Sequence, residues 1–168
     1  SNSNSNNIRW YSDQNAQSLV GTGNTFVTPV LNATNIYYAR DEIIFPSIFG
    51  GPDNNLFGNG SYFNGNHYLI FDNYYQSRLV SVLVYTDTLG DRGIELRNSN
   101  GNVLQDTTIF IPSSPNGIRL YLNFDLPVQN NMQLGISSNT GLWRNNDGAI
   151  FPYNISNIVS VTGASNSS

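Results

Sequence analysis

The chain has 168 residues, a length typical of one domain or of one domain with a small attachment. Charged residues make up 11%, the formal net charge is -4, and the basic residues are arginines spaced singly, which excludes the basic cluster of a nucleic-acid-binding surface. The chain has no cysteine, which excludes disulfides and thiolate metal sites, and no apolar run reaches the about 18 residues of a membrane-spanning helix.

The N-terminal part of the chain predicts an arm, a short strand-rich segment and a linker. Residues 1–7 consist of Ser and Asn, so we expect a flexible arm. Residues 8–42 hold short β-branched and aromatic runs, which predict strands at 8–11, 25–28 and 36–39. Residues 43–60 are rich in Gly and Asn and contain two prolines, which predicts a linker loop.

Residues 61–168 predict a β-sandwich of jelly-roll type, because strand signals recur without a helical pattern between them. The apolar run at 79–85 predicts a buried central strand. Residues 118–124 alternate strictly, so their even-numbered apolar residues should share one face. Asn100-Gly101 predicts a type I′ hairpin turn between two further strands.

Several segments of this second part resemble a known module. In chain order they are YLIFD at 68–72, IELRNSNG at 94–101, LNF at 122–124, LWRNN at 142–146, and 152–163 from PY to VSVTG. They resemble the β-sandwich module of secreted and surface proteins of Bacteroidota, many of which are exported by type IX secretion. The resemblance implies an extracellular or cell-surface location.

The first part is similar to a different unit. Its segments IRWY at 8–11, GTGNTF at 21–26 and TPVLNAT at 28–34 resemble the second half of an immunoglobulin-like repeat. Such repeats often precede the sandwich module and serve as spacers or adhesive stalks. The whole chain is therefore expected to be all-β, a jelly-roll-like sandwich with an N-terminal immunoglobulin-like strand segment.

Both units look incomplete against the patterns that they resemble, which suggests self-assembly. The immunoglobulin-like part lacks its first strands, and the sandwich part lacks a last aromatic strand. We expect neighbouring copies, or neighbouring surface-protein domains, to complete them by donor-strand exchange into a filament. A trimmed chain or a fragment is the alternative explanation. The candidate exchange residues are Ile8, Trp10, Tyr11, Ile36, Tyr37 and Tyr38.

A carbohydrate-binding or adhesive module is the second functional hypothesis. Aromatic rings at strand ends stack on sugar faces, and Asn side chains bond sugar hydroxyls. The candidate ligand residues are Trp143, Arg144, Asn145, Asn146 and Tyr153, and Tyr62 is a further aromatic at a strand end. The alternative is that these rings fill the core.

The sequence offers no constellation for catalysis, so we expect a non-enzymatic protein. His67 is the only histidine, and no Gly-x-Ser-x-Gly motif surrounds any serine. Glu95 alternates with apolar residues and is expected to face solvent or to pair with Arg97 or Arg119 across strands.

Calcium is the one cofactor for which the sequence offers oxygen ligands. The oxygen-rich segments are 53–55, 87–91 and 145–148, but none has the spacing of a calcium-binding loop. All three are also typical of turns, so we expect turns and no required cofactor.

Overall fold

The computed structural model describes residues 8–16, 18–41, 46–137 and 141–165. The predicted arm at 1–7 lies outside these residues. The chain divides into two compact units, Ser1–Pro46 and Ser47–Ser168. The described residues contain strands and no helix, which confirms the all-β prediction. None of them forms a helix long and apolar enough to cross a membrane.

The first unit is a small antiparallel sheet with the order β2-β1-β3. Its strands are β1 (Ile8–Tyr11), β2 (Leu19–Thr22) and β3 (Tyr38–Asp41). β1 is central and pairs with β2 on one side and β3 on the other. The prediction of a strand at 25–28 was wrong, because these residues lie in an irregular connection, and β2 was not predicted.

Three aromatic rings pack together in this unit. The Trp10 and Phe26 rings stack at 5.6 Å between centroids, and Tyr37 meets Phe26 edge-on at 5.0 Å. Gly21 lies opposite Trp10 in the sheet, and a Cβ there would come within 2.7 Å of Phe26. The missing side chain of Gly21 therefore makes room for Phe26, and packing of this ring replaces strand pairing at 25–28.

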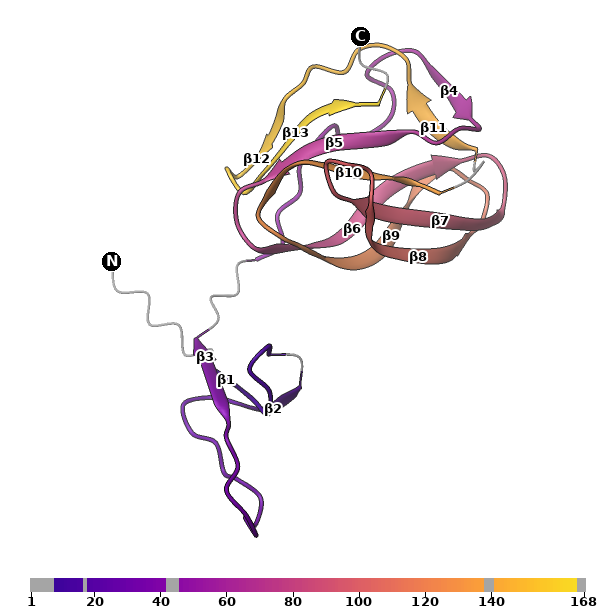
Figure 1. Cartoon of the computed structure of the whole chain (residues 1–168). Coiled ribbons are helices and arrows are strands. Elements are labelled where there is room, and N and C mark those ends of the chain that lie inside the picture. The colour runs from indigo at the N-terminus through magenta and orange to yellow at the C-terminus, as the bar shows by residue number, and fades with distance from the viewer. Residues whose placement is uncertain (1–7, 17, 42–45, 138–140, 166–168) are drawn as a thin grey trace. The chain divides into compact units, whose positions relative to one another are not determined.

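The second unit is a sandwich of two antiparallel sheets (Figure 1). The six-stranded sheet has the order β12-β13-β5-β10-β7-β8. Its strands are β5 (Tyr68–Asn73), β7 (Gly90–Arg97), β8 (Val103–Ile111), β10 (Gln129–Ile136), β12 (Tyr153–Ile155) and β13 (Val159–Ala164). The four-stranded sheet has the order β4-β11-β6-β9. Its strands are β4 (Gly60–Phe63), β6 (Ser77–Thr86), β9 (Ser114–Leu126) and β11 (Leu142–Asn145).

The core lies between the two sheets. Leu120, Leu122 and Phe124 are buried on β9, which confirms the alternation predicted for 118–124. They face residues of the other sheet, of which Leu96 and Met132 are completely buried. Burial of a large apolar side chain contributes about 1.5–3 kcal/mol, so this layer accounts for much of the stability of the unit.

Two sequence predictions need correction here. The strand predicted at 79–85 is β6, but it is not buried on both faces, since Leu83 is 39% exposed on the side away from the core. The turn between β7 and β8 is not of type I′. Among the residues described there only Gly101 has a positive φ, 82°, and its N–H donates to the carbonyl of Asn98. This geometry is a type I turn followed by a left-handed glycine.

The segment 47–59 belongs to the second unit, although the sequence assigned it to a linker. It has no regular secondary structure, but it packs on the sandwich. The Phe49 ring lies 4.9 Å from the guanidinium carbon of Arg119. The Asn59 N–H and side-chain amide donate to the Asp147 carboxylate at 2.6 and 3.0 Å. These contacts hold the segment beside the four-stranded sheet.

Candidate functional site

The four-stranded sheet opens between two of its strands. β11 pairs with β6 at one position only, Leu142 opposite Thr86. Thr86 is fully buried there, and its hydroxyl donates to the carbonyl of Gly141 at 3.1 Å. Beyond that point β11 stays paired with β4 along Trp143 to Asn145. The sheet therefore splits, and the gap is available to side chains and to the 47–59 segment.

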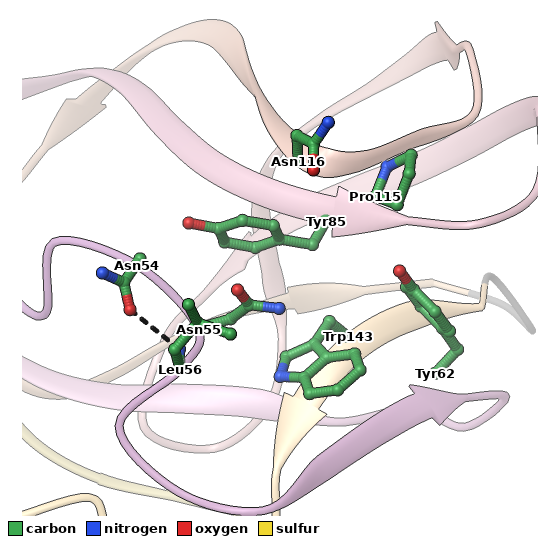
Figure 2. A pocket seen from close by; sticks show the side chains of 8 residues that line it. All are labelled: Asn54, Asn55, Leu56, Tyr62, Tyr85, Pro115, Asn116 and Trp143. Carbon is green, nitrogen blue, oxygen red and sulfur yellow. Dashed lines mark hydrogen bonds between the residues drawn. The ribbon is translucent and has the colours of Figure 1, made fainter.

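A hollow of about 350 Å³ lies at this split, which we call the aromatic hollow. Figure 2 shows the loop residues 54–56, Tyr85 from β6 and Trp143 from β11 around it. Its volume is at the lower end of the range for small-molecule sites. The lining residues are Asn54, Asn55, Leu56, Tyr62, Tyr85, Pro115, Asn116 and Trp143.

The Trp143 ring is fixed by contacts on several sides. Tyr62, its cross-strand neighbour on β4, meets it edge-on at 5.2 Å between centroids. The indole N–H donates to Asn145 Oδ1 at 3.0 Å. Gly60 lies so close that a Cβ there would be 2.7 Å from the ring. The ring orientation is thus set before any ligand arrives, which lowers the entropic cost of binding.

The loop wall of the hollow is tied to the same strand. The Asn145 side-chain amide donates to the carbonyl of Asn55 at 3.0 Å. Within the loop, Leu56 N–H donates to Asn54 Oδ1 at 2.8 Å, which is an Asx-type turn. In the described part of the chain the side-chain amides of Asn55 and Asn116 make no hydrogen bond. Each amide offers both donors and an acceptor toward a ligand.

The structure divides the predicted ligand residues. Trp143 lines the hollow and Asn145 supports it, because alternation along β11 sends both to the same face. Arg144 points to the other face, where its guanidinium lies 5.4 Å from the Phe63 ring centroid and 3.2 Å from His67 Nε2.

The remaining two predicted ligand residues lie apart from the hollow. Asn146 is exposed, and its N–H donates to the carbonyl of Asn59. Tyr153 lies on β12 of the other sheet, and its hydroxyl accepts from the N–H of Ile150.

The predicted assembly residues lie in the first unit. Ile8, Trp10 and Tyr11 belong to the central strand β1, whose two edges are both paired. Tyr38 begins β3, an edge strand of this sheet. Ile36 and Tyr37 precede β3, and Ile36 is 67% exposed.

His67 has a bonded environment on the second unit. Its Nδ1 lies 3.1 Å from Ser165 Oγ, and its Nε2 lies next to the Arg144 guanidinium. Burial, and to a smaller extent the Arg144 charge, lower the pKa of His67 below its usual value. A neutral ring with its proton on Nδ1 satisfies both contacts, since Arg144 can only donate.

Acidic side chains do not gather at the hollow. Glu95 pairs with Arg97 at 2.7 Å, but within β7 and not across strands as predicted, because side chains two residues apart share one face of a strand. The Asp147 carboxylate accepts two hydrogen bonds from Asn59, which lower its pKa. Across the described ranges no three His, Cys, Asp or Glu residues form a group that could hold a metal ion.

Comparison with known protein families finds a match for the first part of the chain. A family model described as "Ig-like domain CHU_C associated" matches residues 1–42. The match covers 42 of the 168 residues, and it makes this part of the chain similar to an immunoglobulin-like repeat. Comparison with curated proteins and with solved structures gives no match for the chain.

Sequence reasoning found part of the hollow. It singled out Trp143, Asn145 and Tyr62, because aromatic and amide residues at strand ends are typical of sugar sites. It missed Tyr85, which lies inside an apolar run and was expected to be buried, and it did not consider Asn116. The sequence gives no signal for Tyr85, because the run 79–85 is apolar at every position but Ser81 and does not show which residues face away from the core.

Proposed function

We propose that the second unit is a non-catalytic glycan-binding module. The observation that carries this proposal is the aromatic hollow, in which a Trp143 ring held by Tyr62 and Asn145 lies next to unbonded amides. Aromatic faces stack on the C–H faces of sugar rings, and amides bond the hydroxyls at the ring edge. The two chemistries occur together at this hollow.

Binding without hydrolysis fits the composition of the hollow. Glycoside hydrolysis generally uses two carboxylates that flank the scissile bond. None of the eight lining residues is acidic. An extracellular or cell-surface location fits a glycan ligand, and the immunoglobulin-like match of residues 1–42 supports this part of the proposal.

A glycan array followed by isothermal titration calorimetry tests the proposal. The full chain should bind at least one class of glycan. Trp143→Ala should reduce that affinity by tenfold or more, since a central aromatic contact contributes about 2 kcal/mol. Trp10→Ala in the first unit is the matched control and should leave the affinity unchanged. Loss of affinity in both variants, or in neither, would contradict the proposal.

Self-assembly by strand addition is a second candidate, and one observation favours it. In the described part of the three-stranded sheet, β2 and β3 each have a neighbour on one side only. Such edges present unpaired backbone groups that another chain can pair with. We propose that copies of the chain, or a neighbouring surface domain, add a strand there and extend into a filament.

Sedimentation velocity of the full chain over a range of concentrations tests this candidate. Assembly should give species larger than the monomer, and Val20→Lys on β2 should shift the distribution toward the monomer, because edge charges oppose strand addition. Val27→Lys makes the same change outside the strands and serves as the control. A monomer at every concentration argues against assembly.

A further inference from the structure

The aromatic hollow continues onto the outer face of β6 and β9. Tyr85 lines the hollow, and Leu83, two residues before it in the chain, lies on the same face of β6. Arg119 lies opposite Leu83 on β9, and Tyr121 lies opposite Ser81. Both are exposed, and Tyr121 retains 67% of its accessible surface. A strip of side chains therefore runs from the hollow along these strands.

Arg119 is held in place on this strip. Its guanidinium carbon lies 4.9 Å from the Phe49 ring centroid, a cation–π contact with the 47–59 segment. One of its terminal nitrogens donates to Ser81 Oγ at 3.2 Å. Two contacts on an exposed side chain fix its position, so less conformational entropy remains to be lost when a ligand binds.

No carboxylate neutralises Arg119 among the residues that the structure describes. Arg78, on the same two strands, pairs with Asp125 at 2.8 Å. Arg97 pairs with Glu95. The contacts of Arg119 are a ring face and a hydroxyl, which leave guanidinium N–H groups available.

The distance between Arg119 and the hollow is close to the spacing of neighbouring sugar units in one oligosaccharide. Leu83, the cross-strand partner of Arg119, is two residues from Tyr85, or about 7 Å along the strand. A ligand with one sugar ring in the hollow would therefore place its adjoining units beside the guanidinium.

We infer that the ligand of this face is an acidic glycan, whose carboxylate or sulfate group binds Arg119 while another ring of the chain occupies the aromatic hollow. The inference rests on the proposed glycan-binding function. A guanidinium forms paired, charge-assisted hydrogen bonds with planar carboxylates and with sulfate oxygens. The protein carries a net charge of -4, so recognition of an anion depends on this local group and not on the overall field.

A glycan array that carries neutral, uronate-containing and sulfated oligosaccharides gives the first test with the full chain. The strongest binders should be acidic. Titration calorimetry with the strongest acidic binder should then show that Arg119→Gln lowers the affinity by about tenfold or more. Arg78→Gln is the matched control, because it removes an exposed arginine that already has a carboxylate partner, and should change the affinity less than about twofold.

Chemical modification of the glycan shows whether its carboxylate or its sulfate group binds Arg119. Methyl esterification should abolish the Arg119 effect if a carboxylate binds, and desulfation should abolish it if a sulfate binds. Neutral glycans as the strongest binders, or an unchanged affinity in Arg119→Gln, would overturn the inference. If Trp143→Ala still abolishes binding in that case, glycan binding at the hollow is supported and only the role of Arg119 is rejected. An array without any binder overturns both.

Discussion

The indole N–H of Trp143 donates a hydrogen bond of 3.0 Å to Asn145 Oδ1, two residues further along the same strand. The other end of the Asn145 amide donates to the carbonyl of Asn55 in the loop opposite. One side chain thus holds both the ring and the loop wall of the aromatic hollow. The geometry of the hollow therefore depends on a residue that does not line it.

Asn145→Ala should weaken glycan binding without unfolding the sandwich. The substitution leaves the Trp143 N–H without its acceptor and releases the loop at Asn55. Each lost hydrogen bond costs about 0.5–1.5 kcal/mol, so the loss of two should lower the affinity by about fivefold or more. Asn146→Ala is the control on the neighbouring exposed residue, and calorimetry measures both. Equal affinities in the two variants would show that Asn145 does not support the hollow.

Gly60→Ala should distort the hollow and destabilise the unit. A Cβ at this position would lie 2.6 Å from the carbonyl oxygen of Arg144 and 2.7 Å from the Trp143 ring. Overpacking of this kind costs about 1–3 kcal/mol. Urea denaturation should show this loss, whereas Ser61→Ala on the exposed next residue should be nearly neutral. An unchanged unfolding free energy in Gly60→Ala would contradict the close packing.

Leu96→Ala should cost about 2–5 kcal/mol of unfolding free energy, because Leu96 is completely buried between the two sheets. Val103→Ala on β8 is the control, since this side chain is 49% exposed. Thermal or urea unfolding measures the difference. Similar losses in the two variants would argue against the sheet packing described above.

The stability of the second unit should fall as the pH is lowered below about 6.5, in part because of His67. Its pKa in the folded protein is depressed by burial and then by Arg144. Between the folded pKa and about 6.5 the unfolded chain binds the proton and the folded chain does not, so protonation favours unfolding. Above that window this residue contributes its full stabilisation.

His67→Gln should reduce that pH dependence. The variant cannot take up a proton, whereas its side-chain oxygen can still accept from Arg144. Unfolding free energies measured above and below about pH 6.5 should therefore differ less in the variant than in the parent chain. Identical pH slopes would show that the histidine does not titrate differently on folding.

Recurring strand signals without a helical pattern between them were enough to predict the all-β sandwich. Residues 118–124 form β9 with the expected buried face, because a single buried side of a strand forces a period of two. The short strands of the first unit were harder. At 25–28 the pattern is strand-like, but the Phe26 ring is used to cover Trp10, and side-chain packing decides the conformation there.

The candidate site was predictable only in part, since it depends on where strands separate. Trp143 and Asn145 stand in one motif and could be found from residue type. Tyr85 belongs to the hollow because β6 and β11 pair only at Thr86 and Leu142 and separate at Tyr85, and no local pattern marks that divergence. The position of Asn55 depends on a hydrogen bond from Asn145, which is 90 residues away in the sequence.

The most direct test of glycan binding at the hollow uses the emission of Trp143. Trp10→Phe leaves Trp143 as the single tryptophan, because the chain has two. Titration of this variant with the strongest glycan from the array should shift the Trp143 emission and saturate at the affinity measured by calorimetry. Calorimetric binding with unchanged Trp143 emission would place the ligand elsewhere and contradict the account.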